Sequence, residues 1–232
     1  MDIHVITGFP DLMRSPLNES IIRQAKKKRL VKVRLHDLRK YAHDRHRTID
    51  DTPYGGGAGM VLKPEPFFEC VEALTAKGPF DEVIYMSADG ERFDQRAANA
   101  LSLKRRLLVL CGHYKGIDER IRTELVTREI SIGDYVLTGG ELPALVLIDA
   151  VVRLIPGVLG DGESMLGDSF QERLLDHPSY TRPAEYRGLR VPDVLLSGDH
   201  KAIGTWRDEQ RLGRTKIRPP FQAVSAWEAR WC

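Results

Sequence analysis

The sequence predicts a soluble α/β protein whose parallel strands are joined by helices. Two short apolar runs, 83–86 and 107–111, each end at a turn, and a stretch of helical spacing at 93–103 separates them. This alternation is typical of parallel strands with crossover helices. The 232 residues, 42% hydrophobic and 29% charged, suffice for one generous α/β domain or for one domain with a small appendage.

The amino-terminal part of the chain predicts a strand, a helix, a second strand and a second helix. Residues 2–7 alternate apolar side chains and run into a Gly-Phe-Pro turn. Residues 18–28 have helical spacing, and 30–38 alternate apolar with basic side chains, as a half-exposed strand does. Residues 64–77 carry apolar side chains at helical intervals, with prolines suited to the first turn.

A long apolar stretch follows at 142–155, interrupted only by Asp149 and Arg153. Because it is apolar on more than one face, it predicts a helix that is buried in the domain or in an interface. A Pro-Gly pair ends it.

The composition of the chain changes after this helix. Residues 158–173 are rich in Gly, Asp, Glu and Ser, which is typical of a mobile linker. Residues 201–232 hold 7 Lys or Arg against 3 acidic residues, and they include three tryptophans. We therefore expect a main domain at 1–160, a flexible linker at 161–173 and a small helical domain at 174–232.

The formal net charge of +2 conceals an uneven distribution, because residues 23–49 hold 11 Lys or Arg against 2 Asp. Such a block suits a nucleic-acid phosphate backbone, whose neutralisation releases counterions. A solvated helix face explains the same block equally well.

Three cysteines without a C-x-x-C spacing argue against a disulfide framework and a zinc site, and favour a reducing cytoplasm. The chain also has no apolar run near the roughly 18 residues that cross a bilayer and no leader sequence.

Two glycine-rich segments are candidate ligand loops. The loop 54–60 has four glycines, which permit close approach of a ligand to the backbone, although a tight structural turn explains it as well. It matches neither the dinucleotide fingerprint nor a phosphate loop. The segment 130–141 is a short apolar run that leads into the pair Gly139-Gly140 before a helix. That pair is either a binding loop or plain punctuation.

Four separated strings resemble the bacterial tRNA (guanine-N1)-methyltransferases of the SPOUT class. They are HDRHRTIDDTPYGGGAGM at 43–60, LCGHYKGIDERI at 110–121, SIGDYVLTGGELPAL at 131–145 and LLSGDHKAIGTWR at 195–207. Their order and spacing agree with the family, and the resemblance extends over residues 1 to about 220.

The resemblance implies an α/β domain whose carboxyl-terminal portion is threaded into a trefoil knot. General topology rules treat such threading as a rare exception, so the residues alone do not predict it. The family is also similar in forming cytoplasmic homodimers with active sites at the subunit interface. Its members bind the tRNA anticodon stem-loop with a small helical domain after a flexible linker, and the resemblance implies no role for a membrane or DNA.

The resemblance further implies a pocket for S-adenosylmethionine. Small residues and backbone groups dominate the matching positions, which suits an adenine that needs edge hydrogen bonds and an apolar slot. The positions carried over are Gly59, Tyr85, Ser87, Gly112, Tyr114, Ser131, Ile132, Gly133, Asp134, Tyr135, Val136, Leu137, Gly139 and Gly140. Ile132 and Leu137 fit equally well as core residues.

Methylation of guanine N1 requires a base, because that nitrogen carries a proton at neutral pH. The resemblance assigns this role to Asp168 in the acidic linker, where closure of the site would desolvate the carboxylate. It places Arg153 near guanine O6, where negative charge develops. From the residues alone, Asp168 fits a solvated linker acid, and Arg153 fits a structural ion pair with Asp149 or a nearby acid.

The resemblance places Arg45, His46, Arg47 and Asp50 on the surface that reads the RNA around guanosine 37. Arginines bind phosphates, and Asp50 can accept hydrogen bonds from the ring and amino donors of guanine. His46 fits equally well as a structural histidine. The family is similar in requiring Mg²⁺, yet the sequence shows no set of oxygen ligands, and this chain has Lys115 where many relatives have glutamate.

Two other functions fit the same residues. One is an RNA methyltransferase of the SPOUT class that acts on a different nucleotide. The other is a non-catalytic RNA-binding protein that retains the fold. Transfer of labelled methyl groups from S-adenosylmethionine would separate these functions.

Overall fold

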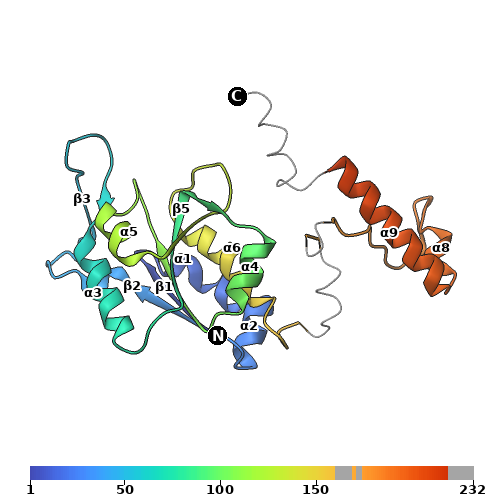
Figure 1. Ribbon diagram of the computed structural model, residues 1–232, viewed down its shortest axis with the longest axis horizontal. Helices are drawn as coiled ribbons and strands as arrows, with labels where there is room; N and C mark the ends of the chain where they lie inside the picture. Colours follow the sequence, from blue (N-terminus) through green and yellow to red (C-terminus); the bar gives the residue numbers. More distant parts are fainter. Residues whose placement is uncertain (160–168, 171–173, 219–232) are drawn as a thin grey trace. The chain divides into compact units, whose positions relative to one another are not determined.

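The computed structural model describes residues 1–159, 169–170 and 174–218. The chain divides into two compact units, Met1–Gly160 and Asp161–Cys232, which Figure 1 draws with the first in blue to yellow and the second in orange to red. Cys232 and two of the three tryptophans, Trp227 and Trp231, lie outside the described residues.

A five-stranded parallel sheet forms the centre of the first unit, in the order β2-β1-β6-β5-β7. Its strands are β1 (Asp2–Thr7), β2 (Lys32–Asp37), β5 (Glu82–Arg92), β6 (Arg106–Cys111) and β7 (Arg128–Ser131). The two central strands, β1 and β6, are buried along almost their whole length. The α/β class with a parallel sheet, expected from the sequence, is confirmed.

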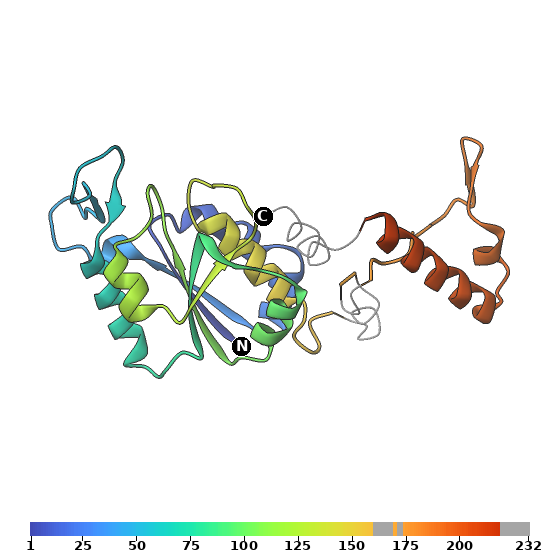
Figure 2. The same cartoon turned by 45° about the horizontal axis from the view of Figure 1, so that its top comes forward.

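Helices cover both faces of this sheet (Figures 1 and 2). One face packs against α1 (Asp11–Arg14), α2 (Ser20–Lys27), α4 (Gln95–Ser102) and α6 (Glu141–Val152). The other packs against α3 (Pro64–Thr75) and α5 (Glu119–Leu125). The alternation of β1 explains this division, because Ile3 and Val5 join the first core cluster and Ile6 joins the second.

Short elements complete the unit: two 3-10 turns, η1 (Pro16–Asn18) and η2 (Leu38–Tyr41), and a small antiparallel pair, β3 (Asp50–Asp51) and β4 (Val61–Leu62). The glycine-rich loop 54–60 connects β3 to β4. Gly55, Gly56, Gly57 and Gly59 all have positive φ, which is the conformation that glycine adopts without strain.

The apolar helix α6 begins one residue earlier and ends three residues sooner than the predicted span 142–155. Ala144, Leu147 and Ile148 are fully buried, whereas Leu142 and Val146 are 57% and 48% exposed. The helix therefore packs on the sheet and also presents apolar side chains outward.

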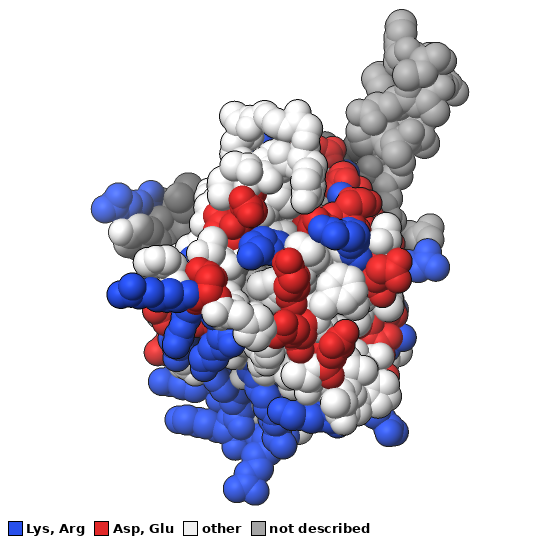
Figure 3. Space-filling view, turned by 90° about the vertical axis from the view of Figure 1, so that its left-hand side faces the viewer, with Lys and Arg blue, Asp and Glu red and all other residues white. Residues whose placement is uncertain are grey.

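The basic block of residues 23–49 does not form one surface. Lys32 pairs with Asp2 at the amino end of β1, whereas Asp37 pairs with Thr7 at its carboxyl end. Cations that precede β2 therefore lie toward the amino edge of the sheet, and those of residues 39–47 follow its carboxyl edge. Figure 3 shows Lys and Arg gathered along the lower edge of one face, with Asp and Glu across its middle.

The second unit contains a long helix, α9 (His200–Ile217), a single turn, α8 (Asp193–Leu196), and a short hairpin of β8 (Glu185–Tyr186) and β9 (Leu189–Arg190). Asp199 caps α9 by accepting hydrogen bonds from the backbone of Lys201 and Ala202. Among the residues described in this unit, none is buried. None of the described helices is long and apolar enough to cross a membrane.

Candidate functional site

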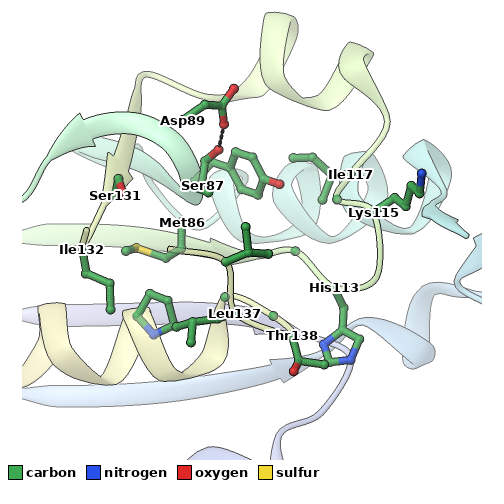
Figure 4. Close-up of a pocket in the computed structure, with 18 of the residues that line it drawn as sticks. Met86, Ser87, Asp89, His113, Lys115, Ile117, Ser131, Ile132, Leu137 and Thr138 are labelled. Carbon is green, nitrogen blue, oxygen red and sulfur yellow. Dashed lines mark hydrogen bonds between the residues drawn. The ribbon is translucent and has the colours of Figure 1, made fainter. Parts of the chain in front are cut away.

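A cavity of about 350 Å³ opens at the carboxyl edge of the parallel sheet. Its walls come from the end of β5, the loop after β6, and the loop between β7 and α6 (Figure 4). Open α/β sheets bind their ligands at this edge. Twelve of the fourteen positions predicted to bind a cofactor line it: Tyr85, Ser87, Gly112, Tyr114, Ser131, Ile132, Gly133, Tyr135, Val136, Leu137, Gly139 and Gly140.

Glycines allow two loops to meet closely at the base of this cavity. The backbone N–H of Gly140 donates to the carbonyl of Gly112 at 2.8 Å, and His113 forms an isolated bridge with Gly139. A Cβ added at Gly140 would lie 2.9 Å from the Cα of Cys111. The two loops approach so closely that only glycine fits at positions 139 and 140, so this pair does more than end the preceding segment.

The loop between β7 and α6 curls over its own backbone. Gly133 has φ +154°, and a Cβ there would lie 2.4 Å from the ring of Tyr135. The Tyr135 hydroxyl donates to the carbonyl of Ile132 at 3.3 Å. Ile132 also packs against the core, in keeping with its alternative interpretation, whereas Leu137 is 38% exposed and is not a core residue.

Two of the predicted cofactor positions, Gly59 and Asp134, lie outside the cavity wall. A Cβ at Gly59 would meet the side chain of Lys115 at 2.8 Å, so this glycine makes room for a residue that does line the cavity. Asp134 is exposed and forms an ion pair with Arg92 at 2.9 Å.

Tyr85 forms the most deeply buried aromatic wall of the cavity. It is 6% exposed, and burial raises the pKa of its hydroxyl to about 12. A Cβ at Gly112 would lie 2.9 Å from this hydroxyl, so the glycine leaves the space that the ring occupies. Tyr85 is therefore neutral at physiological pH and keeps its proton.

A buried acidic residue, Glu141, lies at the start of α6, next to the cavity. Thr7 donates a hydrogen bond to its carboxylate at 2.7 Å, and the Nδ1 atom of His113 lies 3.6 Å from the second oxygen. The His113 ring lines the cavity and packs on Phe9, with 4.2 Å between ring centroids. Sequence reasoning missed this group, although Glu141 ends the conspicuous Thr-Gly-Gly-Glu string.

Sequence reasoning also missed cavity residues in three places. Met86 is the last residue of the predicted strand, Asp89 follows that strand, and Arg122 comes from a helix that was not predicted. Lys115 was noted only as a departure from the family. Met86 and Asp89 lie close in sequence to the predicted positions Tyr85 and Ser87, and this closeness could have pointed to them. Arg122 had no such signal.

The predicted RNA-reading residues lie on a loop that is ordered by one acidic side chain. Asp44 accepts a hydrogen bond from the Thr48 hydroxyl at 2.8 Å, and this bond does most to hold the pKa of its carboxyl below the usual value. The backbone N–H groups of Thr48, at 2.8 Å, and of His46, at 3.1 Å, act in the same direction. Arg45, His46 and Arg47 are exposed. Asp50 is half-buried in β3.

A series of contacts joins this loop to the cavity. Arg39 donates to the carbonyl of Arg47 at 3.4 Å, and its guanidinium lies 5.8 Å from the ring centre of Phe9. Phe9 in turn packs on His113 of the cavity wall. The loop therefore follows the same edge of the sheet as the cavity.

The two predicted catalytic residues lie at the end of the first unit and beyond it. Arg153 is the carboxyl-terminal cap of α6 and is half-buried. Its backbone N–H donates to the backbone carbonyl of Asp149 at 3.2 Å. Asp168 lies outside the described residues. Over the described part of the chain, no group of three or more His, Cys, Asp or Glu side chains could hold a metal ion.

The fold and the cavity define an α/β protein with a cavity at the carboxyl ends of its parallel strands, where this class of protein binds its ligands. The model of the family "tRNA (Guanine-1)-methyltransferase TrmD" matches residues 1–221. The chain therefore belongs to this family and is an enzyme of the tRNA (guanine-N1)-methyltransferase class.

Several curated proteins with the name tRNA (guanine-N(1)-)-methyltransferase are similar over almost the whole chain. The one from Chlorobaculum tepidum is 56% identical over 220 residues, which cover 95% of this chain and 96% of the relative. The one from Geobacillus kaustophilus is 52% identical, covering 95% and 90%. The one from Bacteroides thetaiotaomicron is 54% identical, covering 94% and 98%.

Proposed function

We propose that the protein transfers a methyl group from S-adenosylmethionine to N1 of guanosine 37 in tRNA, directly 3′ of the anticodon. The observation that carries this proposal is the cavity at the carboxyl edge of the sheet, which gathers twelve of the fourteen predicted cofactor positions in a chain of this family. The proposed site of action is the cytoplasm.

The residues of the cavity fit S-adenosylmethionine. Met86, Leu137 and Pro143 offer an apolar slot, while the backbone of the 131–140 loop offers polar groups for an adenine edge. When bound, the cofactor supplies an activated methyl group, so the protein needs no nucleophile of its own. For Mg²⁺ the described residues offer no comparable set of ligands, and no step is assigned to it.

The chemistry at N1 requires removal of its proton. We assign this task to Asp168, on the basis of family resemblance and of its acidic linker position. Negative charge then collects at guanine O6, where the guanidinium of Arg153 would stabilise it. Arg153 is the carboxyl-terminal cap of the apolar helix α6, and its guanidinium keeps its charge at neutral pH, as this role requires.

We further propose that the chain is a homodimer with a knotted cofactor site, and that the second unit binds tRNA after a linker. The outward apolar residues Leu142 and Val146 of α6 support a subunit interface. The close passage of the Gly139-Gly140 loop beside Gly112 supports threading of the chain. Arg45, His46, Arg47 and Asp50 would read the bases around guanosine 37.

Titration calorimetry with S-adenosylmethionine tests the cofactor site. Tyr135→Ala should weaken binding about tenfold or more, which corresponds to ~1.4 kcal/mol, because the ring covers the curled loop of the cavity wall. Tyr186→Ala is the matched control, since Tyr186 is similarly exposed at 58% and lies in the second unit. If both variants bound S-adenosylmethionine with equal affinity, the assignment of the cofactor to this cavity would be contradicted.

A further inference from the structure

The strand β5 carries a large bulge at the point where it reaches the cavity. Met86 and Glu91 both pair with Ile130 of β7, so residues 87–90 are left out of the ladder. Ser87, Ala88 and Asp89 of this bulge line the cavity. A Cβ at Gly90 would lie 2.6 Å from the backbone of Glu129, which shows how closely the bulge returns to β7.

One side chain, Arg122 of α5, holds this bulge against its surroundings. Its guanidinium donates to Asp89 at 3.0 Å and to both carboxylate oxygens of Glu129, at 3.1 and 2.6 Å. It also lies 5.7 Å from the ring centre of Tyr85. Arg122 therefore joins the bulge, the neighbouring strand and the aromatic wall of the cavity.

The hydrogen bonds of the bulge determine what Ser87 can offer a ligand. The Ser87 hydroxyl donates its single proton to Asp89, as Figure 4 shows. Hydrogen bonds from Ser87 and Arg122 hold the pKa of Asp89 below its usual value, so this carboxylate remains charged and accepts. The Ser87 oxygen is therefore left with lone pairs alone for the cavity.

We propose that Arg122 is a positioning residue of the cavity: through Asp89 it fixes the 87–90 bulge and presents the Ser87 oxygen as an acceptor. The ligand group that it fits is a hydroxyl or amino donor, such as those of a nucleoside. This inference rests on the proposed function for the identity of the ligand, but not for the clamp itself.

The test compares Arg122→Met with Arg120→Met in the full-length protein. Arg120 is the matched control, because it lies on the same helix and pairs with Asp118 at 2.7 Å, away from the cavity wall. In the free protein, amide hydrogen exchange of residues 87–91 should rise about tenfold in Arg122→Met and stay unchanged in Arg120→Met. Affinity for S-adenosylmethionine should fall about tenfold in Arg122→Met alone.

Asp89→Asn provides a second variant that should fold normally, because the Asp89 side chain is 67% exposed. It should weaken cofactor binding as Arg122→Met does, and the double variant should be hardly weaker than either single variant, since both changes break one link. Arg122→Lys should restore part of the affinity, because an ammonium can reach one carboxylate but not both.

Unchanged exchange in the bulge of Arg122→Met, or fully additive losses in the double variant, would overturn the proposal. If the wild-type protein binds no S-adenosylmethionine, the proposed function fails by itself. The exchange measurement then still decides whether Arg122 fixes the bulge.

Discussion

Asp168→Asn is expected to slow methyl transfer by at least about 100-fold while leaving the affinity for S-adenosylmethionine unchanged. The amide keeps the shape of the side chain but cannot take the proton from guanine N1, and the cavity residues that would hold the cofactor are untouched. Single-turnover transfer to a tRNA transcript measures the first quantity, and titration calorimetry measures the second.

Asp161→Asn is the matched control for this change, because it removes one carboxylate from the same acidic segment. It should transfer methyl groups at the wild-type rate. Near-normal transfer by Asp168→Asn would exclude Asp168 as the base. A parallel loss of cofactor affinity would mean that the residue serves binding instead of proton removal.

The second large effect concerns complementation between subunits. We propose that Asp168 of one chain serves the cavity of the other chain in the dimer. Mixing Asp168→Ala chains with Tyr135→Ala chains should then rebuild one intact site in each heterodimer. With random reassortment half of the dimers are mixed, so activity should recover to roughly a quarter of the wild-type value.

Each variant alone should have little activity when assayed at a cofactor concentration well below the Kd of the Tyr135→Ala chain. Separate affinity tags on the two chains verify that heterodimer has formed. Activity that stays at the background of the parents, despite verified heterodimer, would show that Asp168 acts within its own subunit or is not the base.

The sequence predicted the strands whose side chains are buried without interruption. The run 2–7 matches β1 in both ends, and 107–111 matches β6 to within one residue, because a central parallel strand must be apolar on both faces. The strand predicted at 30–38 is confirmed as the half-exposed edge strand β2. Its Lys32 and Arg34 are exposed while Val33 and Leu35 are half-buried, because successive side chains of a strand point to opposite faces.

Two elements had no recognisable pattern and were missed. The strand β7 has only four residues and begins with Arg128 and Glu129, so the apolar residues that start at 130 were assigned to a ligand loop and not to a strand. The helix α5 buries only Ile121 and has no apolar stripe. The strand β7 is positioned by pairing with β5, and the helix α5 by packing against α3. Both sets of contacts join residues that are distant in sequence, which local periodicity does not register.

The sequence predicted those parts of the candidate site that are formed by the backbone of glycine residues. The glycine-rich segment 130–141 marked Gly139 and Gly140, and the family resemblance marked Gly112. The structure brings all three together at one edge of the sheet. The clamp by Arg122 and the buried Glu141 depend on side chains that meet only after folding. A charged residue in a sequence is most often a solvated one, so neither was distinguishable beforehand.

The most direct test of the account is the position of the transferred methyl group. The purified protein is incubated with S-adenosylmethionine labelled at its methyl group and with two tRNA transcripts that differ only by guanosine or adenosine at position 37. Both transcripts are digested to nucleosides, and the labelled product is identified by mass spectrometry. We predict labelled N1-methylguanosine from the guanosine-37 transcript and no label from the adenosine-37 transcript. Label in another nucleoside, equal label in both transcripts, or no transfer to either would contradict the proposed function.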